Sequence, residues 1–156
     1  SSKNIKIFHI KTGKELYEAI LNDYSNSDIV IMAAAVSDYK PVEFSKKKIK
    51  KNNNELNIKL EKTTDILFEL GQAKKKQILV GFALENNDEL LHAKNKLETK
   101  NLDLIVLNSL NDEGAGFGYD TNKITVVDYL GKVTAYKLKK KDEVAQDVFN
   151  HIIELI

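Results

Sequence analysis

The sequence predicts an α/β protein with a Rossmann-like, doubly wound and mainly parallel sheet that is flanked by helices. Three apolar runs without alternation, at 28–36, 77–84 and 102–108, are typical of strands that are covered on both faces. Segments with helical periodicity separate these runs, and such alternation is typical of α/β folds. No internal repeat or low-complexity linker interrupts the chain, so we expect a single α/β domain over residues 1–156.

The first elements follow from a short apolar run and a capping pattern. The run IKIFHI at 5–10 has β-type composition and predicts a strand. Thr12 followed three residues later by Glu15 is a capping-box pattern, so a helix should begin there. Its apolar stripe consists of Leu16, Ala19 and Ile20.

Three further helices are predicted. The segment 63–74 should have Thr63 as its N-cap and Asp65 in its first turn, where a carboxylate suits the helix dipole. The segment 87–100 is amphipathic, and 141–156 closes the chain as a helix. In the 87–100 helix, one face should be shared by Leu90, Leu91, Ala93 and Leu97.

Two hairpins complete the expected topology. A protruding β-hairpin is predicted near 48–60, where Leu56, Ile58 and Leu60 alternate with polar residues after an asparagine-rich turn. An antiparallel hairpin is predicted near 123–138, split by Gly131. The segment 109–122 holds three of the seven glycines and should be a loop.

Composition excludes several classes of protein. The net charge of +1 and the lack of aromatic residues interleaved with the lysines argue against nucleic-acid binding. No apolar run is long enough to span a membrane. Cysteine is absent, which fits a reducing compartment, and we expect a cytoplasmic protein. The histidines lack metal-ligand spacing and are His9, His92 and His151.

Ligands of doubly wound sheets bind beyond the carboxyl ends of the strands, and this rule indicates where to look for a site. It selects the segments Ala33–Lys40, Gly81–Glu85 and Asn108–Asn122, together with the helix start at Thr63. No Walker loop, nucleotide-binding glycine fingerprint or nucleophile elbow is present. The glycines of GAGFG, at 114–118, are equally compatible with a flexible loop and a phosphate cradle.

Each candidate feature has two interpretations from its residues alone. The small residues of AAAV at 33–36 allow either a ligand or a helix to approach the backbone closely. Asp38 could hold a ribose hydroxyl or a metal-bound water, or could form a turn. The free N–H groups at the start of the 63–74 helix suit an anion or simple capping.

The lysines are equally ambiguous on composition alone. Lys96 and Lys100 project from one helix face and could bind phosphates or stabilise the helix dipole. A second group could protect an exposed sheet edge or bind phosphate, and it comprises Lys46, Lys47, Lys48, Lys50 and Lys51.

Several motifs occur together in a fixed order. They are MAAAVSDYKP, KIKK ten residues after its aspartate, TTDIL, VGFALE, KLETKNLDLIVLN and GFGYDTN. This set, over about residues 28–128, resembles the phosphopantothenoylcysteine synthetase family (phosphopantothenate–cysteine ligases), in its bacterial CTP-dependent type.

The resemblance implies a reaction of coenzyme A biosynthesis. CTP, not ATP, converts the carboxylate of 4'-phosphopantothenate into an acyl-cytidylate, and the amine of cysteine then displaces CMP. The resemblance also implies Mg²⁺ as a cofactor, CTP as a co-substrate, and a homodimer.

Site residues are carried over from the resemblance position by position. Lys48 would be the catalytic lysine that faces the phosphates, and Asp38 would hold the nucleotide or its metal. The family usually has Asn-Pro-Asp where Thr63, Thr64 and Asp65 stand, and Thr64 is tolerable because proline is favoured but not required at a first helical position. The implied nucleotide-binding residues are Met32, Ala33, Ala34, Asp38, Lys48, Thr64, Asp65, Ile66, Leu67, Phe82, Lys96 and Lys100.

The family also begins with a strand, a GGT-like turn and an SSGKMG-type segment, none of which has a match in this sequence. We therefore expect the chain to be the C-terminal, CTP-binding portion, with full turnover dependent on a further segment that another chain could supply. A non-catalytic nucleotide-binding module is the alternative. A Rossmann-like oxidoreductase is a weaker one because the glycine fingerprint is lacking.

Overall fold

The computed structural model describes residues 4–43, 45, 47–48, 56–85, 87–109, 114–115 and 118–156. Its main sheet has five strands in the order β1-β4-β5-β7-β8. β1 and β4 are parallel to each other and so are β4 and β5, whereas β7 and β8 are antiparallel additions at one edge. The strands are β1 (Ile29–Met32), β4 (Ile78–Glu85), β5 (Leu104–Ser109), β7 (Ile124–Asp128) and β8 (Val133–Ala135).

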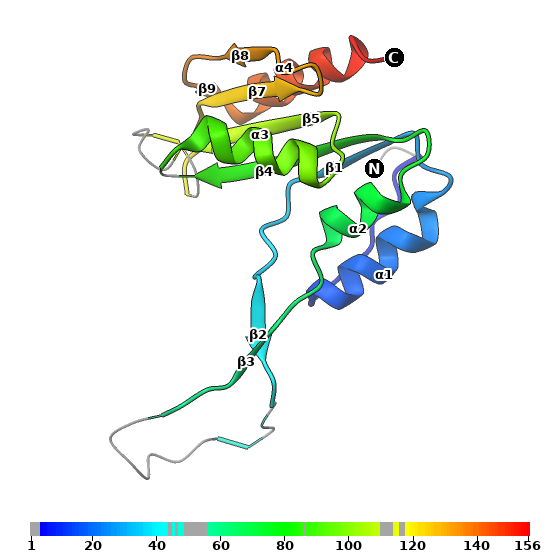
Figure 1. Cartoon of the computed structure of the whole chain (residues 1–156), viewed down its shortest axis with the longest axis vertical. Coiled ribbons are helices and arrows are strands. Elements are labelled where there is room, and N and C mark those ends of the chain that lie inside the picture. Colours follow the sequence, from blue (N-terminus) through cyan, green and yellow to red (C-terminus); the bar gives the residue numbers. More distant parts are fainter. Residues whose placement is uncertain are drawn as a thin grey trace.

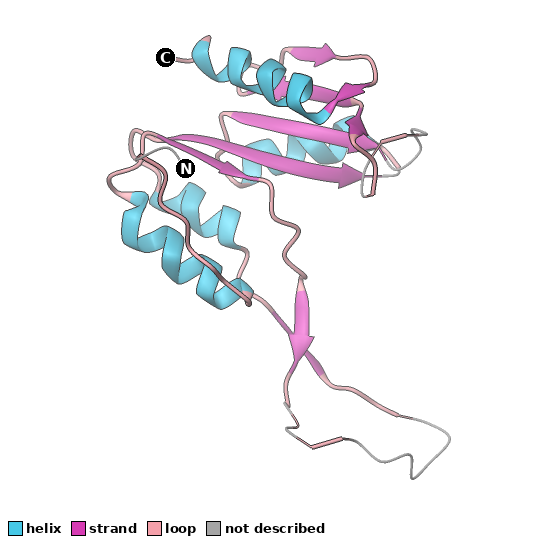
Figure 2. Ribbon diagram, turned by 180° about the vertical axis from the view of Figure 1, so that it is seen from behind, coloured by secondary structure: helices cyan, strands magenta, loops and turns pink. Residues whose placement is uncertain are grey.

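Helices cover both faces of this sheet, as Figures 1 and 2 show. One apolar cluster joins α1 (Gly13–Tyr24), α2 (Ile66–Ala73) and α3 (Glu89–Thr99) to the sheet. A second cluster joins α4 (Lys141–Ile153) to the opposite face. Because alternate residues of β4 and β5 enter the two clusters, these strands are apolar over 78–84 and 104–107, and polar residues follow at their carboxyl ends. The predicted α/β fold with a parallel sheet between helices is confirmed.

The capping residues explain where α1 and α2 begin. Thr12 caps α1 as predicted, accepting a hydrogen bond from the Glu15 backbone N–H at 3.1 Å. The predicted cap of α2 is wrong, because Asp65 fills that position and accepts from the Phe68 N–H at 3.1 Å. Thr63 instead donates its hydroxyl to the Ser37 carbonyl at 2.5 Å, which links the start of α2 to the loop after β1.

Two strand predictions at the start of the chain need correction. Residues 5–10 are exposed and form no strand, and no segment within the described ranges pairs with them. Strand propensity is expressed only against a partner, which explains the difference. The run 28–36 yields a strand only over β1, whose sole ladder in the described part of the chain is with β4. Ile31 is 39% exposed, so β1 is not covered on both faces as expected.

An arm, defined as the described residues 39–43, 45, 47–48 and 56–62, projects away from the sheet (Figure 1). At its base β2 (Tyr39–Pro41) pairs antiparallel with β3 (Leu60–Lys62). A protruding hairpin is thus present, and its described ladder joins residues 39–41 to 60–62. Of the predicted 48–60 hairpin, Leu60 is in this ladder, whereas Leu56 and Ile58 are exposed and outside any described strand. The predicted asparagine-rich turn at 52–54, together with Lys46, Lys50 and Lys51, lies outside the described residues.

The remaining elements largely follow expectation. β7 and β8 form the predicted hairpin, and Gly131 in its turn has a positive φ of 83°. Of the face predicted for α3, Ala93 and Leu97 are buried, whereas the residues exposed contrary to expectation are Leu90 and Leu91. The loop prediction at 109–122 falls partly outside the described residues and otherwise includes β6 (Thr121–Asn122), which pairs with β9 (Lys139–Lys140). No helix among the described residues combines the length and hydropathy that crossing a membrane requires.

Candidate functional site

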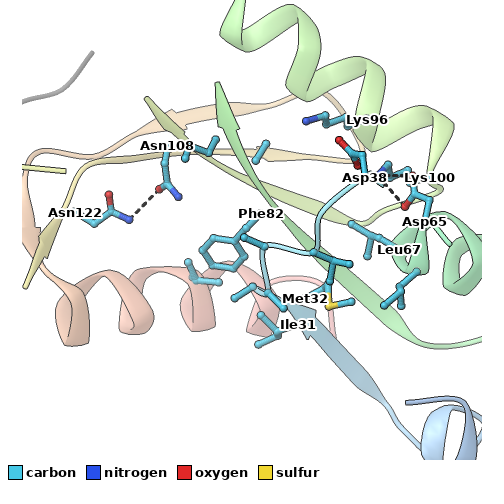
Figure 3. Close-up of a pocket in the computed structure, with 18 of the residues that line it drawn as sticks. Ile31, Met32, Asp38, Asp65, Leu67, Phe82, Lys96, Lys100, Asn108 and Asn122 are labelled. Atoms are coloured by element: carbon cyan, nitrogen blue, oxygen red, sulfur yellow. Dashed lines mark hydrogen bonds and ion pairs between the residues drawn. The ribbon is translucent and has the colours of Figure 1, made fainter. Parts of the chain in front are cut away.

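A cavity of about 750 Å³ opens where β1 and β4 end (Figure 3). Its walls come from the loop after β1, the start of α2, the end of β4, Lys96 of α3, the C-cap Lys100 of that helix, and one side of α4. This is the sheet edge at which doubly wound proteins bind ligands. The topology therefore brings together segments that lie far apart in the sequence.

Most of the residues predicted from the sequence meet in this cavity. Eleven of the twelve line it, and they come from four separate segments: Met32, Ala33, Ala34, Asp38, Thr64, Asp65, Ile66, Leu67, Phe82, Lys96 and Lys100. Lys48 does not line it, because this exposed residue lies on the arm. The structure thus assembles the predicted binding residues and leaves the predicted catalytic lysine apart from them.

The small residues after β1 are part of the wall. Ala33, Ala34 and Ala35 are exposed and line the cavity, so they do not pack a helix against the sheet. Their short side chains leave the backbone of this loop accessible to a ligand. Met32 and Ile66 are buried beside them and join the loop to the core.

The cationic end of the cavity is organised by two ion pairs. Lys100 Nζ lies 2.8 Å from Asp65 Oδ2, and Lys96 Nζ lies 2.5 Å from Glu85 Oε1. Asp65 also caps α2, so this carboxylate receives a helix N–H and a lysine together. An anion bound here would meet the same kinds of donor, since helix N-termini and lysines both attract phosphate. An ammonium group has three donors, so each lysine can hold its carboxylate and a ligand at once.

Asp38 lies on the cavity wall at the same end (Figure 3). Its backbone carbonyl accepts a hydrogen bond from the Thr63 N–H at 2.9 Å, which fixes the loop to the segment before α2. Within the described part of the chain its carboxylate has no hydrogen bond or ion pair. The side chain is therefore available to a cation or a hydroxyl of a ligand.

Other wall residues were not singled out from the sequence. Asn108 and Asn122 bound the segment predicted to lie near a ligand, but neither was chosen as a site residue. The position of Asn108 directly after an apolar run was the available signal. The α4 wall, with Val144, Val148 and Phe149, had no such signal, because its place depends on how the helix crosses the sheet. Of the glycines in GAGFG, Gly114 and Gly118 do not line the cavity, and Gly116 lies outside the described residues.

Comparison with known proteins supplies relatives for this chain. A family model described as the DNA/pantothenate metabolism flavoprotein C-terminal domain matches residues 1–156. The chain is 48% identical over 157 residues to a cysteine/cysteine sulfinic acid decarboxylase from an unknown prokaryotic organism, covering 100% of the chain and 44% of that protein. It is 42% identical over 146 residues to the coenzyme A biosynthesis bifunctional protein CoaBC of Bacillus subtilis, covering 94% of the chain and 36% of that protein.

A solved structure gives the same result for the fold. The crystal structure of the C-terminal domain of coenzyme A biosynthesis bifunctional protein CoaBC is similar with a TM-score of 0.77 and 32% identity. The likeness covers 95% of this chain and 64% of that one. The chain spans less than half the length of the two curated relatives, whose names describe the longer proteins.

Proposed function

Because the chain belongs to the DNA/pantothenate metabolism flavoprotein C-terminal domain family, we propose that it is the CTP-binding part of a phosphopantothenate–cysteine ligase in cytoplasmic coenzyme A biosynthesis. One observation carries the proposal: residues from four distant segments that match the nucleotide-binding motifs of such ligases line a single cavity. The name of the Bacillus subtilis relative, a coenzyme A biosynthesis protein, supports the same assignment.

The proposed reaction has two steps. An oxygen of the 4'-phosphopantothenate carboxylate forms a bond to the α-phosphorus of CTP, and the bond from that phosphorus to the leaving pyrophosphate breaks. The amine of cysteine then attacks the acyl carbonyl, losing a proton to solvent as the amide forms and CMP leaves. The first step brings a carboxylate against a triphosphate, so nearby positive charge must stabilise its transition state.

The cavity offers that charge at one end. Lys96 and Lys100 would contact the phosphates, together with the backbone N–H groups at the start of α2. Phe82 would contact the base or ribose from the apolar part of the wall. The loop of small residues would let the nucleotide lie close to the backbone.

Magnesium fits this arrangement only if the nucleotide supplies most of its ligands. Among the described residues no group of three or more His, Cys, Asp or Glu side chains could hold a metal ion. Mg²⁺ commonly binds through one or two carboxylates plus substrate phosphates, and Asp38 offers one free carboxylate on the wall. Bound there, the ion would neutralise phosphate charge.

Lys48 would complete the site from the arm. Because Lys48 is exposed and does not line the cavity, this role requires the arm to close over the nucleotide, in the same protomer or across a homodimer. Exposed apolar residues on the arm support contact with a second copy, and they include Tyr39, Ile58 and Leu60. The segment with the SSGKMG-type motif, from this protomer's longer form or from a partner, would hold the acyl part.

Calorimetric titration with CTP and Mg²⁺ tests the binding half of the proposal. We expect saturable CTP binding that weakens at least about tenfold in the double variant Lys96→Ala, Lys100→Ala, because each lysine makes a charge-assisted contact. Lys14→Ala is a matched control, since this exposed lysine on α1 pairs with Glu18, on the same helix, and is not in the cavity wall. Absence of CTP binding by the unmodified chain would overturn the proposal.

A turnover assay separates the ligase from a nucleotide-binding module. The chain is supplied with CTP, 4'-phosphopantothenate and cysteine, with and without a protein segment that carries the SSGKMG-type motif. Pyrophosphate release in either mixture supports the ligase. Binding of CTP without release in both mixtures supports the module.

A further inference from the structure

An amide pair forms part of the cavity wall at the end of β5. Asn122 donates a hydrogen bond from Nδ2 to Asn108 Oδ1 at 2.9 Å, and both residues line the cavity. Asn122 is buried, with 8% of its surface exposed, whereas Asn108 is partly exposed. In Figure 3 the pair lies on the other side of Phe82 from Lys96 and Lys100.

The backbone fixes which way both amides point. The Lys123 N–H donates to Asn122 Oδ1 at 3.0 Å, and a backbone N–H can only donate. The oxygen of Asn122 therefore faces Lys123, so its NH₂ group must face Asn108. The side-chain oxygen of Asn108 accepts the hydrogen bond from this NH₂ group. Asn108 Nδ2 therefore lies on the side of its amide that faces away from Asn122.

The remaining NH₂ group of Asn108 is available to a ligand. Within the described residues it makes no hydrogen bond, and no buried side-chain nitrogen or oxygen there lacks a partner, so Nδ2 is accessible. Figure 3 shows this nitrogen on the side of the amide toward Phe82. Asn108 pairs with Leu84 in the sheet, and Val144 and Val148 of α4 also line the cavity. A fixed, neutral donor thus stands beside an aromatic ring and apolar walls.

We propose that Asn108 selects the base of the bound nucleotide by donating from Nδ2 to the ring nitrogen N3 of cytosine. This inference rests on the proposed function. The lysines place the phosphates at the other end of the cavity, so the flat, neutral base is the part of the nucleotide that suits Phe82 and Asn108. Cytosine N3 is an acceptor, whereas uracil N3 carries a hydrogen and meets the same donor unfavourably.

The amide pair makes the choice strict because it resists rotation. Turning Asn108 by 180° would set two NH₂ groups against each other and would leave the Asn122 donor without an acceptor. Leaving a buried donor unpaired is costly, so the pocket keeps presenting a donor whichever nucleotide enters. Discrimination against uracil then comes from a repulsive contact as well as from a lost one.

Two variants reverse the pattern by different routes. Asn108→Asp keeps an oxygen for Asn122 and presents a second oxygen to the cavity. Asn122→Asp keeps an oxygen for the Lys123 N–H but presents an oxygen to Asn108, which must then turn its own oxygen toward the ligand. Both changes present an acceptor to the base in place of the donor, and an acceptor matches uracil N3–H. Asn122→Asp does so without altering Asn108, the residue that contacts the base.

The experiment is calorimetric titration of the unmodified chain and both variants with CTP and UTP in the presence of Mg²⁺. We expect the unmodified chain to prefer CTP, and each variant to bind CTP about tenfold more weakly while its preference shifts toward UTP. Thermal unfolding of each variant shows whether it is folded, and Asn108→Leu, which presents neither group, should lose the preference altogether.

Each outcome bears on the inference. A CTP-to-UTP preference that is unchanged in both aspartate variants overturns it while leaving the proposed function intact. Equal weakening of both nucleotides in folded variants also overturns it, because it indicates a structural role or charge repulsion. Failure of the unmodified chain to bind CTP overturns the proposed function and this inference together.

Discussion

The cavity and the arm are built in opposite ways. The cavity wall rests on the core, since Met32, Ile66 and Ala83 are each no more than 9% exposed. Every described residue of the arm is exposed, including all of those in the strands β2 and β3. Residues that the cavity holds are thus fixed before a ligand arrives, whereas Lys48 on the arm is not fixed by packing. Binding and turnover should therefore respond to different mutations.

The largest effect is expected from Lys48→Ala. Turnover should fall by roughly 10³-fold, because a charge that stabilises the transition state is lost, while the CTP dissociation constant changes by less than about threefold. Pyrophosphate release and calorimetry measure the two quantities on one preparation. Lys47→Ala, at the exposed neighbouring position, is the control. A loss of CTP affinity as large as the loss of turnover would place Lys48 with the binding residues.

Gly71→Ala tests how far the cavity depends on close packing. A Cβ atom at this position in α2 would lie 1.9 Å from the Lys100 carbonyl oxygen, so α2 must move away from the end of α3. We expect the free energy of unfolding to fall by about 3 kcal/mol and CTP binding to weaken, since Asp65 and Lys100 separate.

Urea denaturation measures the change in Gly71→Ala, and Leu56→Ala is the comparison on the arm. That exposed residue should alter the unfolding free energy by less than about 0.5 kcal/mol. If the two variants lose similar stability, the contrast between a packed cavity wall and an unpacked arm is wrong.

A smaller effect is expected at the cap of α2. Asp65→Ala removes the acceptor for the Phe68 N–H and should lower the unfolding free energy by about 1 kcal/mol. Asp65→Asn should keep most of that stability, because asparagine caps helices as well as aspartate does. Equal losses in both variants, measured by urea denaturation, would assign the stability to the ion pair with Lys100 instead.

The smallest effect is expected at Tyr24, which fastens α1 to α2. Its hydroxyl donates to the Leu70 carbonyl at 2.7 Å, so Tyr24→Phe should cost about 0.5 to 1 kcal/mol near neutral pH. Burial, with a smaller contribution from the charge of Asp103, raises the pKa of Tyr24 above its usual value of 10.0.

The raised pKa of Tyr24 gives a sign for the pH dependence. The folded state favours the neutral phenol, so this contribution to stability is full below pH 10 and is lost as the pH rises through the folded-state pKa. We expect the unmodified protein to be more stable than Tyr24→Phe at neutral pH. The difference between their free energies of unfolding should shrink as the pH rises above 10. A difference that grows with pH would contradict the assignment.

The sequence predicted the elements whose pattern is local. Continuous apolar runs indicated β4 and β5, and the Thr12–Glu15 pattern located the start of α1. The predictions that failed depend on contacts with residues distant in the sequence. Residues 5–10 have strand composition but no described partner, and Thr63 is engaged with Ser37, so Asp65 caps α2 instead.

The same distinction holds for the candidate site. The cavity residues from Met32 to Lys100 were identified because their motifs, taken in order, resemble those of a known ligase family. The carboxyl ends of the parallel strands gather these residues at one edge of the sheet. Asn108 and Asn122 were missed because the role proposed for them depends on a hydrogen bond between two strands. No single-residue pattern reports the direction in which an amide is held.

The central claim is that CTP binds at the ends of β1 and β4, against the start of α2. NMR titration of the isotope-labelled chain with CTP and Mg²⁺ tests this most directly, because it reports each residue separately. The account predicts that the largest saturable shifts fall on cavity residues such as Thr64, Asp65, Phe82, Lys96 and Lys100. Shifts centred on α1 or β8, or none at millimolar CTP, would contradict it.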